Sequence, residues 1–222
     1  MENLISRVSR SKVEARASYN RLSRWYDGLA GSTEEKYRRK GMKLIAVQPG
    51  ERVLEIGFGT GQCLLEFARI IGTSGKVFGI DLSDGMAAVA KQRLKEADAA
   101  SRVDFALSDA AYIPFCDGYF DAVFMSFTLE LFDTPEIPLV LDQCKRILRP
   151  TGRLALVTMT KTETPAIPER IYEWFHARMP VLVDCRPILA QVALTQAGFA
   201  IDQVISESMW GLPVEVILAN RP

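Results

Sequence analysis

The chain has 222 residues, of which 48% are hydrophobic, and its 27 basic residues balance 27 acidic ones. This composition excludes a disordered protein, and a balanced charge argues against a nucleic-acid partner. No run of about 18 apolar residues occurs, so no membrane span is predicted. The N-terminus lacks the apolar core of a signal peptide, so we expect a cytoplasmic protein. No Cys-x-x-Cys pair is present, and no metal site is predicted.

The first 47 residues predict helical structure with a local basic excess, formed by Arg7, Arg10, Lys12, Arg16, Arg21 and Arg24. A basic amphipathic helix can lie on an anionic membrane surface, so peripheral membrane contact is one interpretation of this segment. The other interpretation is a solvated lid that folds over a ligand pocket. The sequence leaves both open.

From Pro49 onward, short β-branched runs alternate with segments of helical length. Strands are predicted at 52–56, 76–80, 103–107, 121–125, 153–158, 201–206 and 214–219, and helices at 61–72, 84–97, 136–148, 167–178 and 187–197. A turn at Pro150–Gly152 is predicted to end one helix before the next strand. Apolar strands separated by helices indicate a mostly parallel, doubly wound sheet with helices on both faces. We therefore expect a single α/β domain over residues 1–222, with a helical lid at 1–47 and a core at 48–222.

The most informative segment is Val53–Gly61, which reads Val-Leu-Glu-Ile-Gly-Phe-Gly-Thr-Gly. A buried strand ends in a glycine-rich turn, where missing side chains allow a sharp bend and the close approach of a ligand. A dinucleotide site has the spacing G-x-G-x-x-G, whereas this turn has G-x-G-x-G. Glu55 precedes the turn and would repel a pyrophosphate, but it suits a ligand that carries an amine. The motif therefore favours S-adenosylmethionine (SAM) over a nicotinamide dinucleotide.

Three further strand ends supply candidate cofactor contacts. Asp81 closes the second strand and is placed to accept hydrogen bonds from ribose hydroxyls, although a helix N-cap is the structural alternative. Asp109 closes the third strand as an acceptor for an adenine amine, or else as the first residue of an Asx turn. Ser126 and Phe127 follow the central strand, and we expect both beside the cofactor.

These motifs, in this order, resemble the class I SAM-dependent methyltransferases over about residues 19 to 160, and most of all the ubiquinone/menaquinone biosynthesis C-methyltransferases. The resemblance implies a Rossmann-like, seven-stranded sheet that ends in an antiparallel hairpin. It also implies a set of cofactor contacts: Glu55, Gly57, Gly59 and Gly61 for the methionine part, Asp81 for the ribose, Leu82 and Met86 beside the adenine, Asp109 with the neighbouring Ala110 for the adenine amine, and Tyr26 for closure over the cofactor. The quinone enzymes carry an Arg-Asn-rich segment after the fourth strand. This chain has Phe127–Asp133 there instead.

Methyl transfer from a sulfonium is an in-line displacement that needs a general base only if the acceptor must lose a proton. Glu130 and His176 are the candidate catalytic residues. Each has a structural alternative, as a capping carboxylate and as a packed histidine respectively. Tyr172, Asp184 and Arg186 are candidate substrate contacts, and Asp184 and Arg186 equally suit a surface ion pair.

The sequence thus predicts methyl transfer from SAM to a small hydrophobic acceptor, such as a quinone precursor or a lipid. A phospholipid N-methyltransferase at a membrane surface and a SAM-binding module without turnover are the alternatives. A nicotinamide-dependent oxidoreductase is disfavoured by the position of the third glycine and by Glu55.

Overall fold

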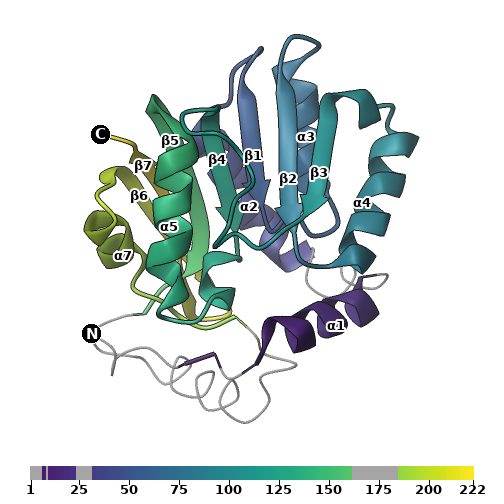
Figure 1. Cartoon of the computed structure of the whole chain (residues 1–222). Coiled ribbons are helices and arrows are strands. Elements are labelled where there is room, and N and C mark those ends of the chain that lie inside the picture. The colour runs from purple at the N-terminus through teal and green to yellow at the C-terminus, as the bar shows by residue number, and fades with distance from the viewer. Residues whose placement is uncertain (1–6, 9, 24–31, 162–184) are drawn as a thin grey trace.

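The computed structural model describes residues 7–8, 10–23, 32–161 and 185–222 (Figure 1). These residues form one seven-stranded sheet with the strand order β3-β2-β1-β4-β5-β7-β6. The strands are β1 (Arg52–Ile56), β2 (Lys76–Asp81), β3 (Val103–Leu107), β4 (Phe120–Ser126), β5 (Leu148–Met159), β6 (Ala200–Met209) and β7 (Leu212–Asn220). Strands β1 to β5 pair in parallel, and β7 runs antiparallel to both β5 and β6. The predicted fold class is confirmed.

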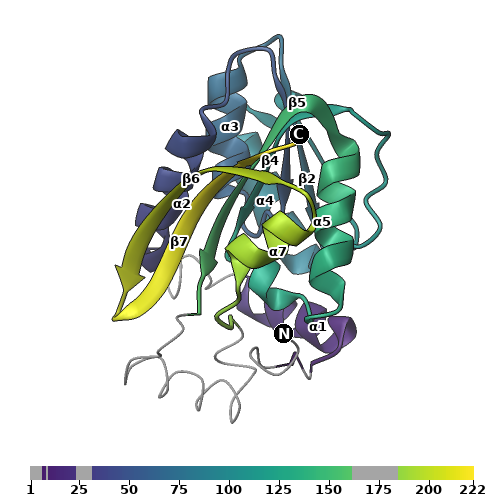
Figure 2. The same cartoon turned by 90° about the vertical axis from the view of Figure 1, so that its left-hand side faces the viewer.

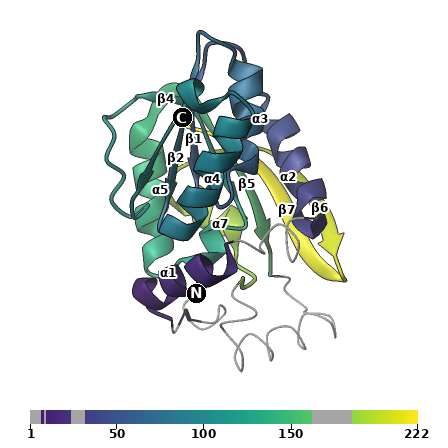
Figure 3. The same ribbon diagram turned by 90° about the vertical axis from the view of Figure 1, so that its right-hand side faces the viewer.

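Helices cover both faces of the sheet. The described helices are α1 (Lys12–Leu22), α2 (Ser32–Ile45), α3 (Gln62–Ile71), α4 (Asp84–Glu96), α5 (Glu136–Ile147) and α7 (Ala190–Gln196), together with the short 3-10 helices η2 (Ala100–Arg102) and η3 (Leu129–Leu131). Buried side chains of α2, α3 and α4 pack into one hydrophobic core, and those of α5 and α7 pack into another on the opposite face (Figures 2 and 3). Successive residues of β1 alternate between the cores, since Val53 faces the first and Leu54 the second.

The predicted turn at Pro150–Gly152 is wrong, because these residues lie inside β5. The register explains the misleading signal. Phe120 pairs with Leu148 but Ala122 pairs with Arg153, so β5 carries extra residues against β4. A β-bulge of this kind uses the same Pro and Gly residues as a turn. A Cβ on Gly152 would lie 2.9 Å from the carbonyl oxygen of Arg149, which shows how tightly the bulge folds back.

The topology fixes where a ligand can bind. Strand β1 pairs with β2 on one side and with β4 on the other, so the connections reverse direction between β1 and β4. Ligands of open parallel sheets bind at the carboxyl ends of the strands at such a switch point. In Figure 1 this edge is at the bottom, where α1 crosses beneath the ends of β2 and β3.

Candidate cofactor site

A pocket opens at the carboxyl ends of β1, β2 and β4. Its floor is formed by strand ends and the turns that follow them, namely Ile56, Gly57, Gly59, Ile80, Asp81, Leu82, Ser108, Ala110 and Ser126. Its walls come from Met86 of α4, from Phe127, Thr128, Leu131, Phe132, Asp133 and Glu136, and from the N-terminal residues Val8, Arg10, Lys12, Ala15 and Tyr19. Gly57, Gly59, Asp81, Leu82, Met86, Ala110, Ser126 and Phe127 were all predicted as cofactor contacts, so the structure brings most of that set together.

The glycine turn has the conformation that its sequence predicts. Gly57, Gly59 and Gly61 have φ values of +73°, +51° and +76°, in the left-handed region that side chains disfavour. A Cβ on Gly57 would overlap the side chain of Thr128, and a Cβ on Gly61 would lie 2.8 Å from the Cβ of Ala90. Gly57 therefore makes room for the side chain of Thr128, whereas Gly61 allows α3 to pack against α4.

Asp81 is the best-placed polar group of the pocket floor. Its carboxylate accepts hydrogen bonds from the N–H of Gly59 at 2.9 Å and from the N–H of Ser83 at 2.8 Å. Burial raises the pKa of Asp81, although these backbone donors oppose the shift. The alternative role as a helix cap is taken by Ser83, whose Oγ accepts from the N–H of Met86. Asp81 is thus free to receive ligand hydroxyls with its remaining lone pairs.

Glu55 does not line the pocket. It is buried on the α2–α4 face of the sheet, at the N-terminus of α3, where Cys63 and the N–H of Leu64 donate to its carboxylate. Burial raises its pKa to about 8, and one oxygen, Oε2, has no hydrogen-bond partner among the described residues. This geometry supports a role in holding the glycine turn against α3, with any effect on a ligand passing through that turn.

Asp109 makes the Asx turn that was its structural alternative, because its Oδ1 accepts from the N–H of Ala111 at 3.0 Å. Its Oδ2 accepts from the ammonium group of Lys12 at 2.5 Å. The residues on either side, Ser108 and Ala110, line the pocket, whereas the Asp109 side chain faces α1.

The end of β4 is strained in a way that the sequence does not reveal. Phe127 has a φ of +50°, which is rare for a bulky residue, and its N–H donates to the carbonyl oxygen of Val157 at 2.7 Å. The buried Oγ of Ser126 has no hydrogen-bond partner among the described residues. Backbone strain and an unsatisfied hydroxyl at a pocket are typical of ligand-binding positions.

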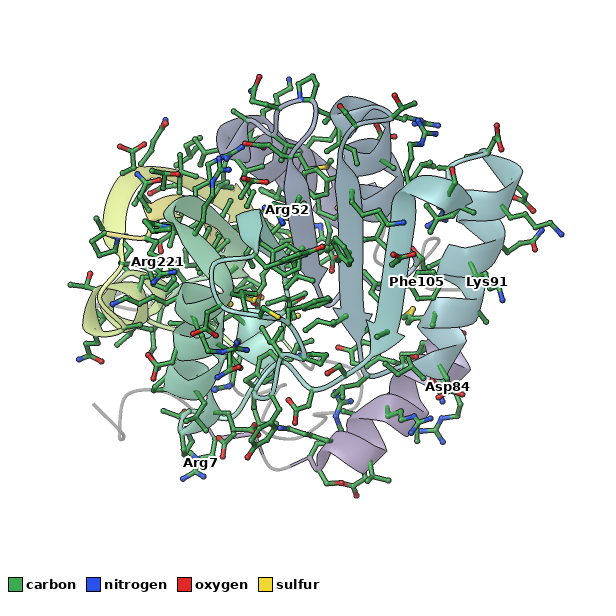
Figure 4. All side chains as sticks on the ribbon, turned by 45° about the horizontal axis from the view of Figure 1, so that its top comes forward. Arg7, Arg52, Asp84, Lys91, Phe105 and Arg221 are labelled. Carbon is green, nitrogen blue, oxygen red and sulfur yellow. The ribbon has the colours of Figure 1, made fainter. Side chains whose placement is uncertain are left out.

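Sequence reasoning missed the charged contacts that hold the N-terminal segment over the pocket. Arg7 makes three hydrogen bonds of 2.6–3.0 Å to Asp133, and Lys12 contacts both Asp109 and Glu136 at 2.5 Å. Farther along α1, Arg16 and Asn20 bind Asp84 at 2.9 and 2.8 Å. In Figure 4, Arg7 lies below α5 and Asp84 lies beside α1, so these charged contacts extend across the edge of the sheet that carries the pocket. The local basic excess was the available signal, but its acidic partners lie far away in the sequence.

We expect the Arg7–Asp133 contact to restrain the N-terminal segment at neutral pH. Bonding to Arg7 lowers the pKa of Asp133 to about 2, so the attachment is present above the ordinary carboxyl range and is lost only as the pH falls toward 2. Asp133→Asn should raise the hydrogen-exchange rate of residues 12–22 by about fivefold, the value of one largely exposed ion pair. Glu66→Gln, which breaks the exposed Glu66–Arg69 pair on α3, is the matched control. An unchanged exchange rate in Asp133→Asn would show that other contacts hold this segment.

Glu130 and Arg186 are buried beside the pocket and do not line it. Glu130 accepts from the Oγ1 of Thr158 at 2.9 Å and from the N–H of Met159 at 3.1 Å, so it is bound to the end of β5. Burial raises its pKa to about 7. Arg186 donates to the carbonyl oxygen of Phe132 at 2.6 Å, and burial lowers its pKa. Tyr26, Tyr172, His176 and Asp184 lie outside the described residues.

Comparisons with known proteins agree with this site. A family described as "Methyltransferase domain" matches residues 53–152. The ubiquinone/menaquinone biosynthesis C-methyltransferase UbiE of Ectopseudomonas mendocina is 34% identical over 149 residues, which are 67% of this chain and 57% of that protein. The 2-phytyl-1,4-naphtoquinone methyltransferase of Synechococcus elongatus is 33% identical over 141 residues, 64% of this chain and 60% of that protein. The chain thus spans less than two thirds of the length of these relatives.

Solved structures share the fold. A SAM-dependent methyltransferase from Aquifex aeolicus superposes with a TM-score of 0.61 at 24% identity, covering 82% of this chain and 87% of that one. The [4+2]-cyclase SpnF superposes with a TM-score of 0.76 at 19% identity, covering 96% of this chain and 97% of that one. The fold alone therefore leaves the reaction open, and the sequence matches decide the family. The sequence matches place the chain among the class I SAM-dependent methyltransferases, whose methyl donor is SAM.

Proposed function

We propose that this protein transfers a methyl group from SAM to a small hydrophobic acceptor of the quinone type. Two relatives carry quinone substrates in their names, the UbiE protein and the phytylnaphthoquinone methyltransferase. Neither of these names includes a phospholipid, so they favour the quinone class over the phospholipid alternative that the sequence left open. The single structural observation that carries the proposal is the pocket at the ends of β1, β2 and β4, with the Asp81 carboxylate in its floor.

The residues of the pocket fit SAM. Along the edge of the sheet, the order β3, β2, β1, β4 presents Ala110, Asp81, Gly57 and Ser126 in turn. An extended ligand with adenine near β3 and ribose at Asp81 would place its amino-acid end over Gly57 and Ser126. The open space at Gly59, where no atom lies within 4 Å of an added Cβ, and the unsatisfied Oγ of Ser126 both suit that end of the ligand. Bound SAM supplies an activated methyl group.

The protein's own part in the reaction is to orient the acceptor and to exclude water. Beyond β4 the pocket wall carries three large apolar side chains, Phe127, Leu131 and Phe132, while the carboxylates of Asp133 and Glu136 are bound by Arg7 and Lys12. Such a wall suits an apolar acceptor and removes water that would compete for the methyl group. The N-terminal segment closes the other side with Val8 and Tyr19. Holding the two reactants in line in a dry site accounts for most of the catalysis that this chemistry needs.

Glu130 has a positioning role in this proposal. Both of its oxygens are bound to β5, at Thr158 and Met159, so it fixes the strand end that borders the acceptor side. Because its pKa is raised to about 7, the folded state favours the protonated form. Its stabilising contribution is present below the ordinary carboxyl pKa and is lost as the pH rises through 7.

Glu130→Gln should therefore flatten the fall in stability between about pH 4.5 and pH 7 while kcat changes by less than about threefold. Thermal unfolding and methyl transfer are measured for both proteins across this range. A general base would behave differently, because its removal costs about 10²- to 10⁴-fold in rate and abolishes the acidic limb of the pH profile. That second result would move Glu130 from a positioning residue to a catalytic one.

The direct test of the proposed function is transfer of a radiolabelled methyl group from SAM to a naphthoquinol, the reduced form of a naphthoquinone, that lacks the ring methyl group. The reduced ring is used because its carbon must be electron-rich to accept the methyl group, and the displaced ring proton is released to solvent. We expect a labelled, organic-extractable product together with S-adenosylhomocysteine. A phosphatidylethanolamine acceptor is the control and should stay unlabelled. Binding of SAM with no transfer to any quinone would contradict the proposed acceptor class. It would favour the alternative that the protein binds SAM without catalysing methyl transfer.

A further inference from the structure

Three large apolar side chains are far more exposed than the others in the described residues. They are Val13 at 78%, Tyr112 at 76% and Trp210 at 73%, whereas the next most exposed reach only 50%. A scattered exposed apolar residue needs no explanation. These three, however, all lie at the edge of the sheet that carries the pocket.

Their placement follows from the topology. Val13 is on α1, next to Lys12, which binds Asp109 at the end of β3. Tyr112 lies in the turn after β3, where its N–H donates to the carbonyl oxygen of Asp109. Trp210 is at the tip of the β6–β7 hairpin. Because Met159 at the carboxyl end of β5 pairs with Val214, that tip extends past the same edge of the sheet, as Figure 2 shows.

Trp210 is the first residue of the β6–β7 turn, where a bulky aromatic residue is unusual. The two-residue turn Trp210–Gly211 has φ values of +54° and +82°, the pattern of a type I′ hairpin turn. Asn or Asp is strongly favoured at the first of these positions, and a bulky side chain there is strained. A large aromatic residue held in strain and exposed to solvent fits a contact with a partner better than it fits stability.

The charges around this edge indicate the kind of partner. Arg7, Lys12 and Arg16 are bound to carboxylates of the pocket rim, and Lys36 and Lys40 both contact Glu207 near the hairpin tip. These basic groups are therefore compensated within the chain and leave little net attraction for an anionic surface. Trp and Tyr side chains, in contrast, favour the boundary between lipid headgroups and acyl chains.

We propose that the pocket edge docks on a lipid bilayer through Trp210, Tyr112 and Val13, by insertion of apolar side chains and with little dependence on lipid charge. This docking rests on the proposed function in one respect, because an apolar acceptor would reach the pocket directly from the bilayer. In this proposal α1 has two roles. Its basic side chains close the pocket, and its exposed Val13 contacts the bilayer. Among the described helices, none has both the length and the hydropathy that a membrane span requires.

The test is sedimentation with vesicles of phosphatidylcholine alone and of phosphatidylcholine with phosphatidylglycerol. We expect the protein to bind both kinds similarly, and 0.5 M salt to change this binding by less than about threefold. Trp210→Asn should weaken binding about tenfold, which corresponds to one large side chain withdrawn from an apolar environment. Because Asn suits the turn better than Trp, this variant should unfold at the same or a higher temperature, so lost binding cannot be ascribed to misfolding. Ile70→Ser, at the opposite end of the molecule on α3, is the matched control.

Binding that survives in the Trp210→Asn/Tyr112→Ser double variant would overturn the proposal, as would no binding to either vesicle. Binding only to anionic vesicles that salt reverses would also overturn the proposal, because it would show electrostatic attraction of the basic helix α1 to anionic lipids. A change from dimer to monomer in Trp210→Asn would show that a second copy occupies this face instead. Calorimetry with S-adenosylhomocysteine separates the two proposals, because docking can fail while the cofactor still binds, and the reverse also holds.

Discussion

Asp81→Ala is expected to weaken SAM binding by about 100-fold, which equals about 3 kcal/mol from the loss of two hydrogen bonds to a charged group. The carboxylate lies in the pocket floor. The N–H groups of Gly59 and Ser83 hold it in one orientation, so it needs no rearrangement to accept hydrogen bonds from the ligand. Asp81→Asn keeps one acceptor oxygen and should lose about half of that free energy. Calorimetric titration with S-adenosylhomocysteine measures both.

The matched control for Asp81 is Asp104→Ala on the neighbouring strand β3. Asp104 is exposed and pairs only with Lys76 in the described residues, at 3.1 Å. Its removal should leave affinity within about twofold, since exposed ion pairs contribute little. Near-normal affinity in Asp81→Ala would refute the ribose assignment.

Gly57→Ala is expected to destabilise the protein by about 3 kcal/mol, through two separable effects. A side chain at φ +73° costs about 1–2 kcal/mol, and the added methyl group overlaps Thr128. Gly59→Ala isolates the first effect, because its φ is also positive but no atom lies within 4 Å of the added Cβ. It should cost only about 1–2 kcal/mol in urea unfolding.

The overlap at Gly57 can be relieved from the other side. In the Gly57→Ala/Thr128→Ala double variant, the methyl group meets no Thr128 hydroxyl or Cγ2, so the excess cost over Gly59→Ala should largely disappear. A loss in the double variant equal to the sum of the losses in Gly57→Ala and Thr128→Ala would mean that the two positions are uncoupled and that Gly57 does not make room for Thr128.

Local patterns were sufficient for the strands, for the parallel sheet and for the glycine turn of the pocket floor, whereas the antiparallel hairpin was implied by the family resemblance. β-Branched runs and the glycine turn predicted every described strand to within a few residues, except that β5 begins at Leu148 rather than Arg153. That error arose because Pro150 and Gly152 give the same local signal in a bulge as in a turn. The place of Asp81 in the pocket floor followed from its position at a strand end, and its role at the ribose stays a prediction.

The lid could not be predicted in the same way, because its contacts join residues far apart in the chain. Arg7 and Asp133 are 126 positions apart, and Lys12 and Asp109 are 97 apart. The sequence showed the basic half of these pairs and so allowed either a membrane or a pocket as its partner. In the structure these basic side chains bind the pocket rim, which favours the lid interpretation of α1. Arg186, considered for a surface pair, is instead fully buried and binds the carbonyl oxygen of Phe132.

The range predicted as a helical lid, residues 1–47, contains two described helices with different roles, α1 and α2. α1 lies at the pocket, whereas α2 packs its buried residues Tyr37 and Ile45 into the core beneath the sheet. The OH group of Tyr37 donates to the carbonyl oxygen of Ser208 at 2.6 Å, which ties α2 to the β6–β7 hairpin. Two helices with similar polarity in the sequence thus have different places in the fold, because only tertiary contacts distinguish a lid from a covering layer.

The most direct test of the central claim is calorimetric titration of the intact chain with SAM, with S-adenosylhomocysteine and, separately, with NADH. The pocket at the ends of β1, β2 and β4 predicts binding of the first two with dissociation constants of about a micromolar, close to −8 kcal/mol, and no heat from the third. Heat from NADH alone, or from none of the three, would contradict the assignment of this pocket to SAM.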